Sequence, residues 1–218
     1  MASTSAIVTI ADTYQIMEAI ENCQTESDDV IVEKYLLFWS HVCRVMSNWG
    51  IVFSFVVKDV QMKLEKLQEK LKNDPENYKT ILRMAKHEAE NGTIRNLKPN
   101  RSGTGHILVL KRALEFVIDL LDGVFCAPDP SIRVSTIAKA AYDKHLSQFH
   151  SWPIRTCVSG ALLSLPRKDE FLIRLRGDMP SKDDNRFHET LTVQGREIIR
   201  RQDALVERFN LADYNPSA

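Results

Sequence analysis

The sequence predicts a single all-α domain built from about eight helices. Glycine and proline are scarce, with 8 of each in 218 residues, so the chain has few of the turns that a many-stranded β fold needs. Apolar residues recur every three or four positions over long stretches, which is typical of amphipathic helices. The apolar fraction of 44% and the charged fraction of 27% are ordinary for a globular protein.

The first half of the chain carries this pattern in four stretches, and each stretch ends at residues that disfavour a helix. The helices are expected over residues 11–22, 30–47, 51–72 and 76–90. Asn48-Trp49-Gly50, Asn73-Asp74-Pro75 and Asn91-Gly92 supply the breaks. The polar stretch 91–105 is then expected to be a loop.

The second half predicts four further helices and one shorter helix. They are expected over 106–122, from Ser135 or Thr136 to about 150, from Pro153 to a point before Pro166, over 167–176 and over 187–209. Gly123 is expected to end the first of them, and Cys126-Ala-Pro-Asp-Pro130 to form a loop. The stretch 177–186 is the strongest loop prediction in the chain.

The charge balance excludes several classes of protein. Lys and Arg number 29, as do Asp and Glu, so neither a nucleic-acid-binding domain nor a polybasic membrane anchor is expected. The first residues lack the basic and apolar regions of a secretory signal. The longest nearly apolar run, Ile51 to Val57, is too short to span a bilayer. We therefore expect a cytoplasmic protein.

No pattern in the sequence predicts an enzyme, a metal site or a cofactor. No Cys-x-x-Cys or His-Glu-x-x-His motif occurs, and His145 and His150 lie about 140° apart on a helix. P-loop, Gly-x-Gly-x-x-Gly and Gly-x-Ser-x-Gly motifs are also absent. Gly103-Thr-Gly105 before a helix is compatible with a phosphate contact, but a plain loop leading into the helix fits it better.

Three polar side chains border the apolar face of the helix expected over 51–72. At about 100° per residue, Lys63 lies about 40° and Lys66 about −20° from Asp59, so the three form one stripe. An acid and two ammonium groups at that border are suited to a ligand whose polar head stays at the rim while its tail enters the interior. The alternatives are an ordinary i,i+4 surface pair and a short coiled coil of about two heptads.

A second candidate site surrounds His150, which is expected near a helix end beside Leu146 and Trp152. A neutral imidazole offers one donor and one acceptor to a buried polar group. The alternative is a core histidine whose ring bonds to the backbone.

Three segments, in the same order, resemble the glycolipid transfer protein family. The first is Phe53-Ser-Phe-Val-Val-Lys-Asp59-Val-Gln-Met-Lys63-Leu-Glu-Lys66-Leu, similar to the Asp-Val-x-x-(Asn/Lys)-Ile/Leu-x-Lys-Leu helix of the family. The second is Leu108-Val-Leu-Lys-Arg112-Ala-Leu-Glu-Phe116, similar to its Leu-x-Lys-Arg-Gly-Leu-x-Phe helix. The third runs from Ala141-Tyr142 through His150-x-Trp152 to Leu165-Pro166. Together they extend from Phe53 to Pro166.

The resemblance implies a two-layer helical fold that transfers sphingolipids between membranes without covalent chemistry. In the family, the acid matching Asp59 accepts the amide N–H of ceramide, and the histidine matching His150 donates to the amide carbonyl. Such a pair favours a sphingosine amide over a glycerolipid ester, because leaving a buried polar group unsatisfied costs ~1–3 kcal/mol. The resemblance places the lipid chains against residues for which a core role is the alternative: Phe53, Val56, Phe116, Leu120, Leu146 and Val158.

The identity of the head group is left open between a sugar and a phosphate, with a slight preference for phosphate. Lys63 resembles the members that carry ceramide 1-phosphate, but those members have arginine where this chain has Gly105 and Val109. Glycolipid members have Asn at 63 and Trp at 109. His106 is expected to point elsewhere, about 100° from position 105. The other candidates for head-group contact are Arg101 and Arg112.

Two other functions stay open: a sphingolipid sensor or scaffold that acts through a protein partner, and a helical adaptor with no lipid cargo. The expected partners of a transfer protein are a glycosphingolipid or ceramide 1-phosphate, and a membrane surface contacted transiently. Trp49 and Trp152 are candidates for that contact, with burial in the core as the alternative. We expect a monomer in which residues 1–218 form one lipid-transfer domain.

Overall fold

The computed structural model describes residues 10–47, 53–177 and 179–217, which form ten α-helices, two 3₁₀ turns and no named strand. The all-α prediction is confirmed. The helices are α1 (Ile10–Glu21), α2 (Val32–Ser47), α3 (Ser54–Asn73), α4 (Pro75–Tyr78), α5 (Ile81–Glu90), α6 (Gly103–Cys126), α7 (Val134–His145), α8 (Trp152–Leu163), α9 (Lys168–Arg176) and α10 (Asp184–Arg208).

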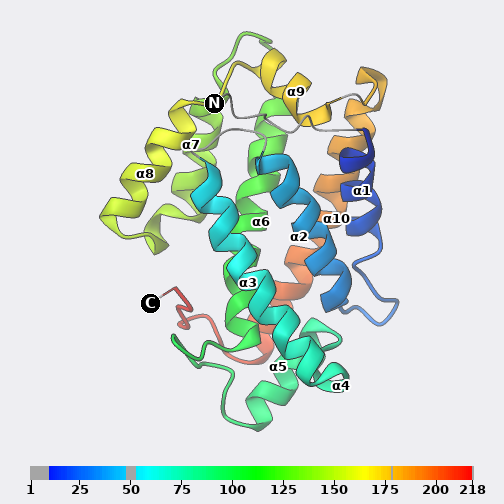
Figure 1. Cartoon of the computed structure of the whole chain (residues 1–218), viewed down its shortest axis with the longest axis vertical. Helices are drawn as coiled ribbons and strands as arrows, with labels where there is room; N and C mark the ends of the chain where they lie inside the picture. The colour runs from blue at the N-terminus through cyan, green and yellow to red at the C-terminus, as the bar shows by residue number, and fades with distance from the viewer. Residues whose placement is uncertain (1–9, 48–52, 178, 218) are drawn as a thin grey trace, which may run out of the picture.

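The helices are arranged in two layers (Figure 1). Helix α6 runs through the centre of the molecule, and α7 and α10 pack along it. Helix α2 packs between α1 and α3 in the other layer. Helix α3 also contacts α6, so the two layers meet along these two helices.

Helix α2 supplies a rigid aromatic support for α3. Tyr35, Phe38 and Trp39 are almost fully buried. The ring of Trp39 meets that of Tyr35 edge-on at a centroid separation of 6.2 Å and that of Phe38 at 5.6 Å. Such aromatic pairs contribute about 0.5–1.5 kcal/mol beyond the burial of their surface. The cluster thus belongs to the helix that packs along α3, the helix that carries Asp59.

The helix expected over 76–90 is in fact two helices. Helix α4 ends at Tyr78, and α5 begins at Ile81. Thr80 stands between them with an extended backbone, and its hydroxyl oxygen accepts a hydrogen bond from the backbone N–H of Arg83. A threonine in this N-cap geometry starts a new helix rather than continuing the previous one.

Helix α6 is longer at both ends than expected. It begins at Gly103, because the Ser102 hydroxyl oxygen accepts the backbone N–H of Gly105 at 2.9 Å and caps the first turn. It continues through Gly123 to Cys126. A Cβ atom at Gly123 would lie 2.4 Å from a methyl carbon of Ile137. Glycine at 123 therefore permits the close approach of α7 and does not end the helix.

The helix expected from 135 to 150 is shorter. Helix α7 ends at His145, and a 3₁₀ turn over Ser147–Phe149 carries the chain to His150. Arg133 occupies the N-cap position, so neither serine nor threonine caps α7. The expected loop 177–186 contains a 3₁₀ turn, Ser181–Asp183, and the first residues of α10. The predicted break at Asn48-Trp49-Gly50 lies outside the described residues.

Candidate functional site

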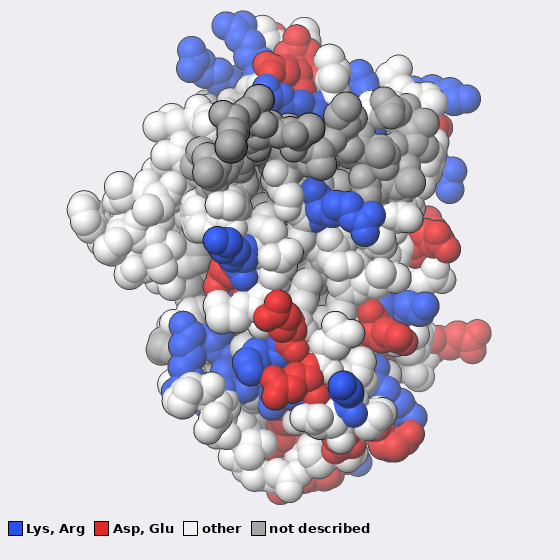
Figure 2. Space-filling model, in the orientation of Figure 1, with Lys and Arg blue, Asp and Glu red and all other residues white. Residues whose placement is uncertain are grey.

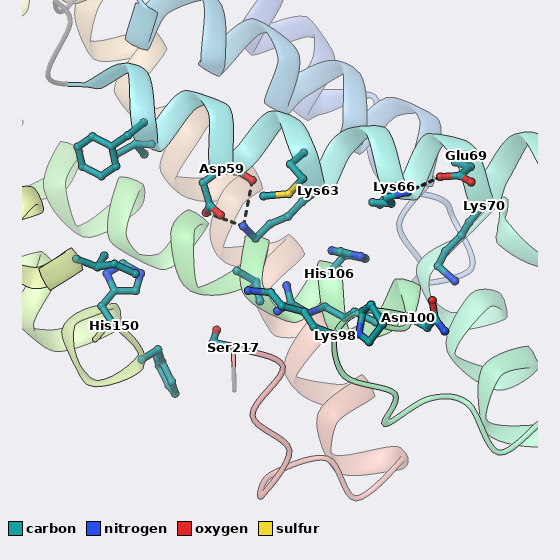
Figure 3. Close-up of a pocket in the computed structure, with 18 of the residues that line it drawn as sticks. Asp59, Lys63, Lys66, Glu69, Lys70, Lys98, Asn100, His106, His150 and Ser217 are labelled. Carbon is teal, nitrogen blue, oxygen red and sulfur yellow. Dashed lines mark hydrogen bonds and ion pairs between the residues drawn. The ribbon is translucent and has the colours of Figure 1, made fainter. Parts of the chain in front are cut away.

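A cavity of about 990 Å³ opens between α3, the loop that precedes α6 and the segment that leads into α8. Its walls combine charged side chains with apolar ones (Figure 3). The lining consists of Phe55, Val56, Asp59, Met62, Lys63, Lys66, Glu69, Lys70, Asn73, Lys98, Pro99, Asn100, Arg101, His106, Val109, Phe149, His150, Ile154, Val158 and Ser217.

Asp59 and Lys63 form an ion pair on one wall of the cavity. The ammonium group of Lys63 lies 2.6 Å from a carboxylate oxygen of Asp59 and donates to its backbone carbonyl at 3.0 Å. Burial lowers the pKa of Lys63, and the Asp59 carboxylate acts against that shift. The Asp59 side chain stays 59% exposed, so its carboxylate keeps acceptor capacity toward the cavity.

His150 reaches the same cavity from the opposite side (Figure 3). The Tyr142 hydroxyl lies 2.8 Å from Nδ1 of His150. Burial lowers the pKa of His150, and the negative charge of Asp59 acts against that shift. The ring is therefore neutral at pH 7, and a Tyr142 hydroxyl that donates to Nδ1 leaves the ring proton on Nε2.

Positively charged side chains gather around Lys63, at the charged end of the cavity. The pKa of Lys63 is lowered further by Arg101 and Lys98, so these three positive charges lie near one another. Burial and the surrounding cations, Arg101 first, hold the pKa of His106 at about 4. His106 is thus a neutral ring among positive charges. In the lining as a whole, two acids, Asp59 and Glu69, stand against five cations, and this excess favours an anionic ligand.

The side chain of Arg101 packs against Gly105, where there is no room for a larger residue. A Cβ atom at Gly105 would lie 2.5 Å from the Tyr214 hydroxyl and 2.9 Å from Cγ of Arg101. The stem of Arg101 therefore packs over the glycine. The Arg101 residue is 7% exposed, and its Nε has no hydrogen-bond partner among the described residues. A buried guanidinium N–H without a partner is ready to bind an acceptor in the cavity.

Glu88 anchors the loop that carries Arg101. It is 1% exposed, and its carboxylate accepts the backbone N–H groups of Gly103 at 2.6 Å and Thr104 at 2.9 Å. It also accepts the hydroxyls of Thr104 and Tyr78. A carboxylate at the N-terminus of a helix is stabilised by the helix dipole. These contacts fix the start of α6 and, through it, the position of Arg101.

The structure brings several predicted residues together on the cavity and places others elsewhere. Arg112 lies outside the lining; its guanidinium donates to Asn215 and Ser217 and stacks 3.5 Å from the ring centroid of Phe149. Trp49 lies outside the described residues. The predicted residues that line the cavity are Asp59, Lys63, Lys66, Arg101, His150, Val56 and Val158.

Four predicted chain-contact residues belong to the hydrophobic core or pack against it, and they do not line this cavity. Their contact with lipid chains stays a prediction. They are Phe53, Phe116, Leu120 and Leu146.

Sequence reasoning missed seven polar residues of the cavity: Glu69, Lys70, Asn73, Lys98, Asn100, His106 and Ser217. The expectation that His106 points away is wrong, because α6 begins before it and turns its ring into the cavity. Lys98 and Asn100 lie on the loop before α6, whose path no periodicity predicts. Lys70 lies a turn beyond Lys66 on α3, and extending the predicted stripe by one turn would have found it.

The apolar end of the cavity leads to an uncharged part of the surface. Phe55, Val56, Ile154 and Val158 line that end. Helix α8 begins there with Trp152, which is 71% exposed. Figure 2 shows that the lobe built around α8 is nearly free of charged side chains on this face. The arrangement suits an amphiphile with an anionic head and an apolar tail.

The described residues form neither a metal-binding cluster nor a membrane-spanning helix. No group of three or more His, Cys, Asp or Glu side chains in that part of the chain is arranged to hold a metal ion. No helix among those residues is long and apolar enough to cross a membrane.

Comparisons with known proteins identify similar chains. A family model described as "Glycolipid transfer protein (GLTP)" matches residues 30–177. The human ceramide-1-phosphate transfer protein is 30% identical over 162 residues, which cover 72% of this chain and 75% of that protein.

Solved structures agree with the sequence match. The apo form of the mouse ceramide-1-phosphate transfer protein matches with a TM-score of 0.82 and 26% identity, over 93% of this chain and 99% of that one. The human protein in complex with 12:0 ceramide-1-phosphate matches with a TM-score of 0.81 and 25% identity, over 91% and 97% of the two chains.

Proposed function

Since this chain belongs to the glycolipid transfer protein family, we propose that it binds one ceramide-based lipid and moves it between membranes. Members of this family are lipid transfer proteins and not enzymes. The observation that carries the proposal is the convergence of Asp59, Lys63 and His150 on one cavity that has a charged end and an apolar end.

The ceramide amide binds between Asp59 and His150. The Asp59 carboxylate accepts the amide N–H, and Nε2–H of His150 donates to the amide carbonyl. The hydroxyl of Tyr142, 2.8 Å from Nδ1, supports this assignment because it holds the ring proton on Nε2. An ester at the same place would offer no N–H, and Asp59 would then face the lipid without a donor.

The head group is anionic, and Lys63, Lys98 and Arg101 hold it. The mutual effect of these cations on the pKa of Lys63 supports a common site for them. Lys63 supplies a point charge, and Arg101 supplies the planar fork that binds phosphate in a bidentate manner. Arg101 thus takes over the role of the arginines that Gly105 and Val109 replace. Lys66 stands at the outer rim and adds a solvent-exposed charge.

The lipid chains enter at the apolar end, past Val56 and Val158, and then separate core side chains. Phe53, Phe116, Leu120 and Leu146 are the core side chains that meet them. Trp152 inserts into the membrane surface during loading and release, and its exposure supports that role. Because buried core residues from Ile16 to Tyr214 form one cluster, we extend the proposal to a single lipid-transfer domain over residues 1–218.

Transfer of fluorescent ceramide 1-phosphate between two vesicle populations tests the proposal. We expect the wild-type chain to accelerate transfer and the Asp59→Val and His150→Leu variants to have lost most of that activity. Binding of the lipid without transfer would instead support a sensor or scaffold. No binding of any sphingolipid would leave only the helical adaptor.

A further inference from the structure

The cavity continues along α3 well beyond the place proposed for the phosphate. From Lys63 to Asn73 the helix axis rises about 15 Å at 1.5 Å per residue, and residues along this length line the cavity. Hydrogen bonds to one phosphate group reach only about 3 Å from its oxygens. The space between α3 and the loop before α6 is therefore longer than a bare phosphate occupies.

The walls of this extension carry both hydrogen-bond donors and acceptors. Lys66, Glu69 and Lys70 lie on the α3 side, and Asn100 lies on the loop side (Figure 3). Asn73, the last residue of α3, also lines the cavity. Both asparagines are exposed to solvent, and neither side chain makes a hydrogen bond within the described part of the chain. Amide groups donate and accept, as hydroxyl groups do. A phosphate accepts only, so it leaves the amide oxygens of the two asparagines without a donor.

The charge of the extension excludes a cationic group beyond the phosphate. Lys66 is paired there with Glu69 at 2.9 Å and Lys70 with Glu88 at 3.8 Å, which leaves the charge of Lys98 without an ion-pair partner among the described residues. Quaternary ammonium groups are usually recognised by aromatic side chains. Besides two histidines, the lining has two aromatic residues: Phe55 at the apolar end, and Phe149, whose ring is covered by the guanidinium of Arg112. Choline and ethanolamine head groups are therefore disfavoured.

A neutral sugar attached directly to ceramide is disfavoured as well. It would fill the space beside Lys63 and Arg101 without supplying a negative charge. The Nε of Arg101 would then need an uncharged acceptor inside a cationic cluster. Position 109, where a tryptophan would stack on a sugar, is valine in this chain.

We infer that the head group is a phosphodiester-linked polyol, so that the cargo is a lipid of the ceramide phosphoinositol class. The phosphodiester lies between Lys63, Lys98 and Arg101. The polyol ring extends along α3, where Asn73, Asn100 and Glu69 bind its hydroxyls. This inference rests on the proposed function and narrows its cargo.

Competition between two lipids tests the inference. Delipidated protein is incubated with vesicles that contain equal amounts of ceramide phosphoinositol and ceramide 1-phosphate with the same chains, and native mass spectrometry reads the bound ratio. We expect the wild-type chain to retain about tenfold more ceramide phosphoinositol, which corresponds to about 1.4 kcal/mol. The Asn73→Ala/Asn100→Ala double variant should lower the ratio toward one. Asn185→Ala, an exposed asparagine on α10, should keep it.

The outcomes separate the inference from the proposed function. Equal or greater retention of ceramide 1-phosphate by the wild-type chain would overturn the inference and leave sphingolipid transfer standing. The same would follow if the double variant kept the tenfold ratio. If neither lipid were retained, the proposed function would fail together with the inference.

Discussion

The ammonium group of Lys63 lies 2.6 Å from a carboxylate oxygen of Asp59, although the two side chains differ greatly in exposure. That of Lys63 is 6% exposed and that of Asp59 is 59% exposed. The pair therefore offsets part of the desolvation of the lysine while leaving acceptor capacity on the acid. One ion pair thus prepares both an acceptor for an amide N–H and a cation for a head group.

Removing the acid should destabilise the protein because Lys63 would lose its partner. We expect Asp59→Asn to lower the free energy of unfolding by about 1 kcal/mol, a modest loss because the carboxylate is largely exposed. Urea unfolding at pH 7 measures it. Glu65→Gln on the exposed side of the same helix is the matched control and should change stability little. An equal loss in both variants would contradict the role of the pair.

Tyr142 should act on transfer only through His150. Without the tyrosine hydroxyl, the His150 ring can place its proton on either nitrogen, and only one tautomer donates to the lipid. We expect Tyr142→Phe to reduce transfer several-fold and His150→Leu to reduce it at least tenfold, with no further loss in the double variant. Vesicle transfer rates check this. Fully additive losses would show that the two residues act separately.

Lys63 and Arg101 should decide between charged and neutral head groups. We expect Lys63→Asn and Arg101→Gln each to lower the affinity for ceramide 1-phosphate about tenfold or more, since a charge-assisted hydrogen bond is lost. Affinity for glucosylceramide should change much less. Lipid-vesicle titration measures both affinities, with Arg83→Gln on the exposed face of α5 as the control. A parallel loss for both lipids would contradict a phosphate site.

His106 should make the empty protein sensitive to acid. Its pKa is about 4 in the folded state against about 6.5 in an unfolded chain, so the folded state resists protonation. The contribution of the neutral ring to stability is complete above pH 6.5 and is lost as the pH falls toward 4. It amounts to about 3 kcal/mol.

Urea unfolding at pH 7 and at pH 4.5 checks this sensitivity. The wild-type chain should lose about 2.4 kcal/mol more stability than His106→Asn over this range. A bound phosphate lipid should reduce the difference, because its negative charge favours the protonated ring. Equal acid sensitivity in the two proteins would show that His106 does not titrate as described.

Trp152 should affect transfer without affecting the bound cargo. Its exposed ring stands at the start of α8, next to the apolar end of the cavity. We expect Trp152→Ala to slow transfer several-fold and to weaken vesicle binding, while native mass spectrometry shows the same lipid retained. The control is Val193→Ala, at an exposed position on α10. Phe209→Ala is less suitable because its ring packs against the core. Loss of retained lipid would assign Trp152 to the cavity instead.

Most of the fold follows from the apolar periodicity, because burial of one helix face dominates the free energy of a helical protein. The predicted helices over 11–22, 30–47 and 187–209 match α1, α2 and α10 within a few residues. The errors in the predicted helix boundaries arise where a glycine allows two helices to pack closely and where a threonine caps a new helix. Gly123 admits Ile137, and Thr80 caps α5, and neither role is visible without the neighbouring helix.

The residues of the site likewise divide into those that the sequence predicts and those that depend on distant contacts. Asp59 and Lys63 share a helix, so their spacing alone predicts the pair. Arg101 and His106 depend on where α6 begins, and that is fixed by Glu88, fifteen residues before Gly103 in sequence. A buried carboxylate that caps a distant helix leaves no periodic signal. The loop that it anchors carries the cations that distinguish this cavity.

The central claim is that Asp59 and His150 recognise the ceramide amide. Transfer of ceramide 1-phosphate compared with a diacylglycerol phosphate of matched chains tests it most directly, because the two lipids share the phosphate and differ at the amide. We predict that the wild-type chain transfers the amide lipid at least tenfold faster, and that Asp59→Val removes this preference. Equal transfer of both lipids by the wild-type chain would contradict the claim.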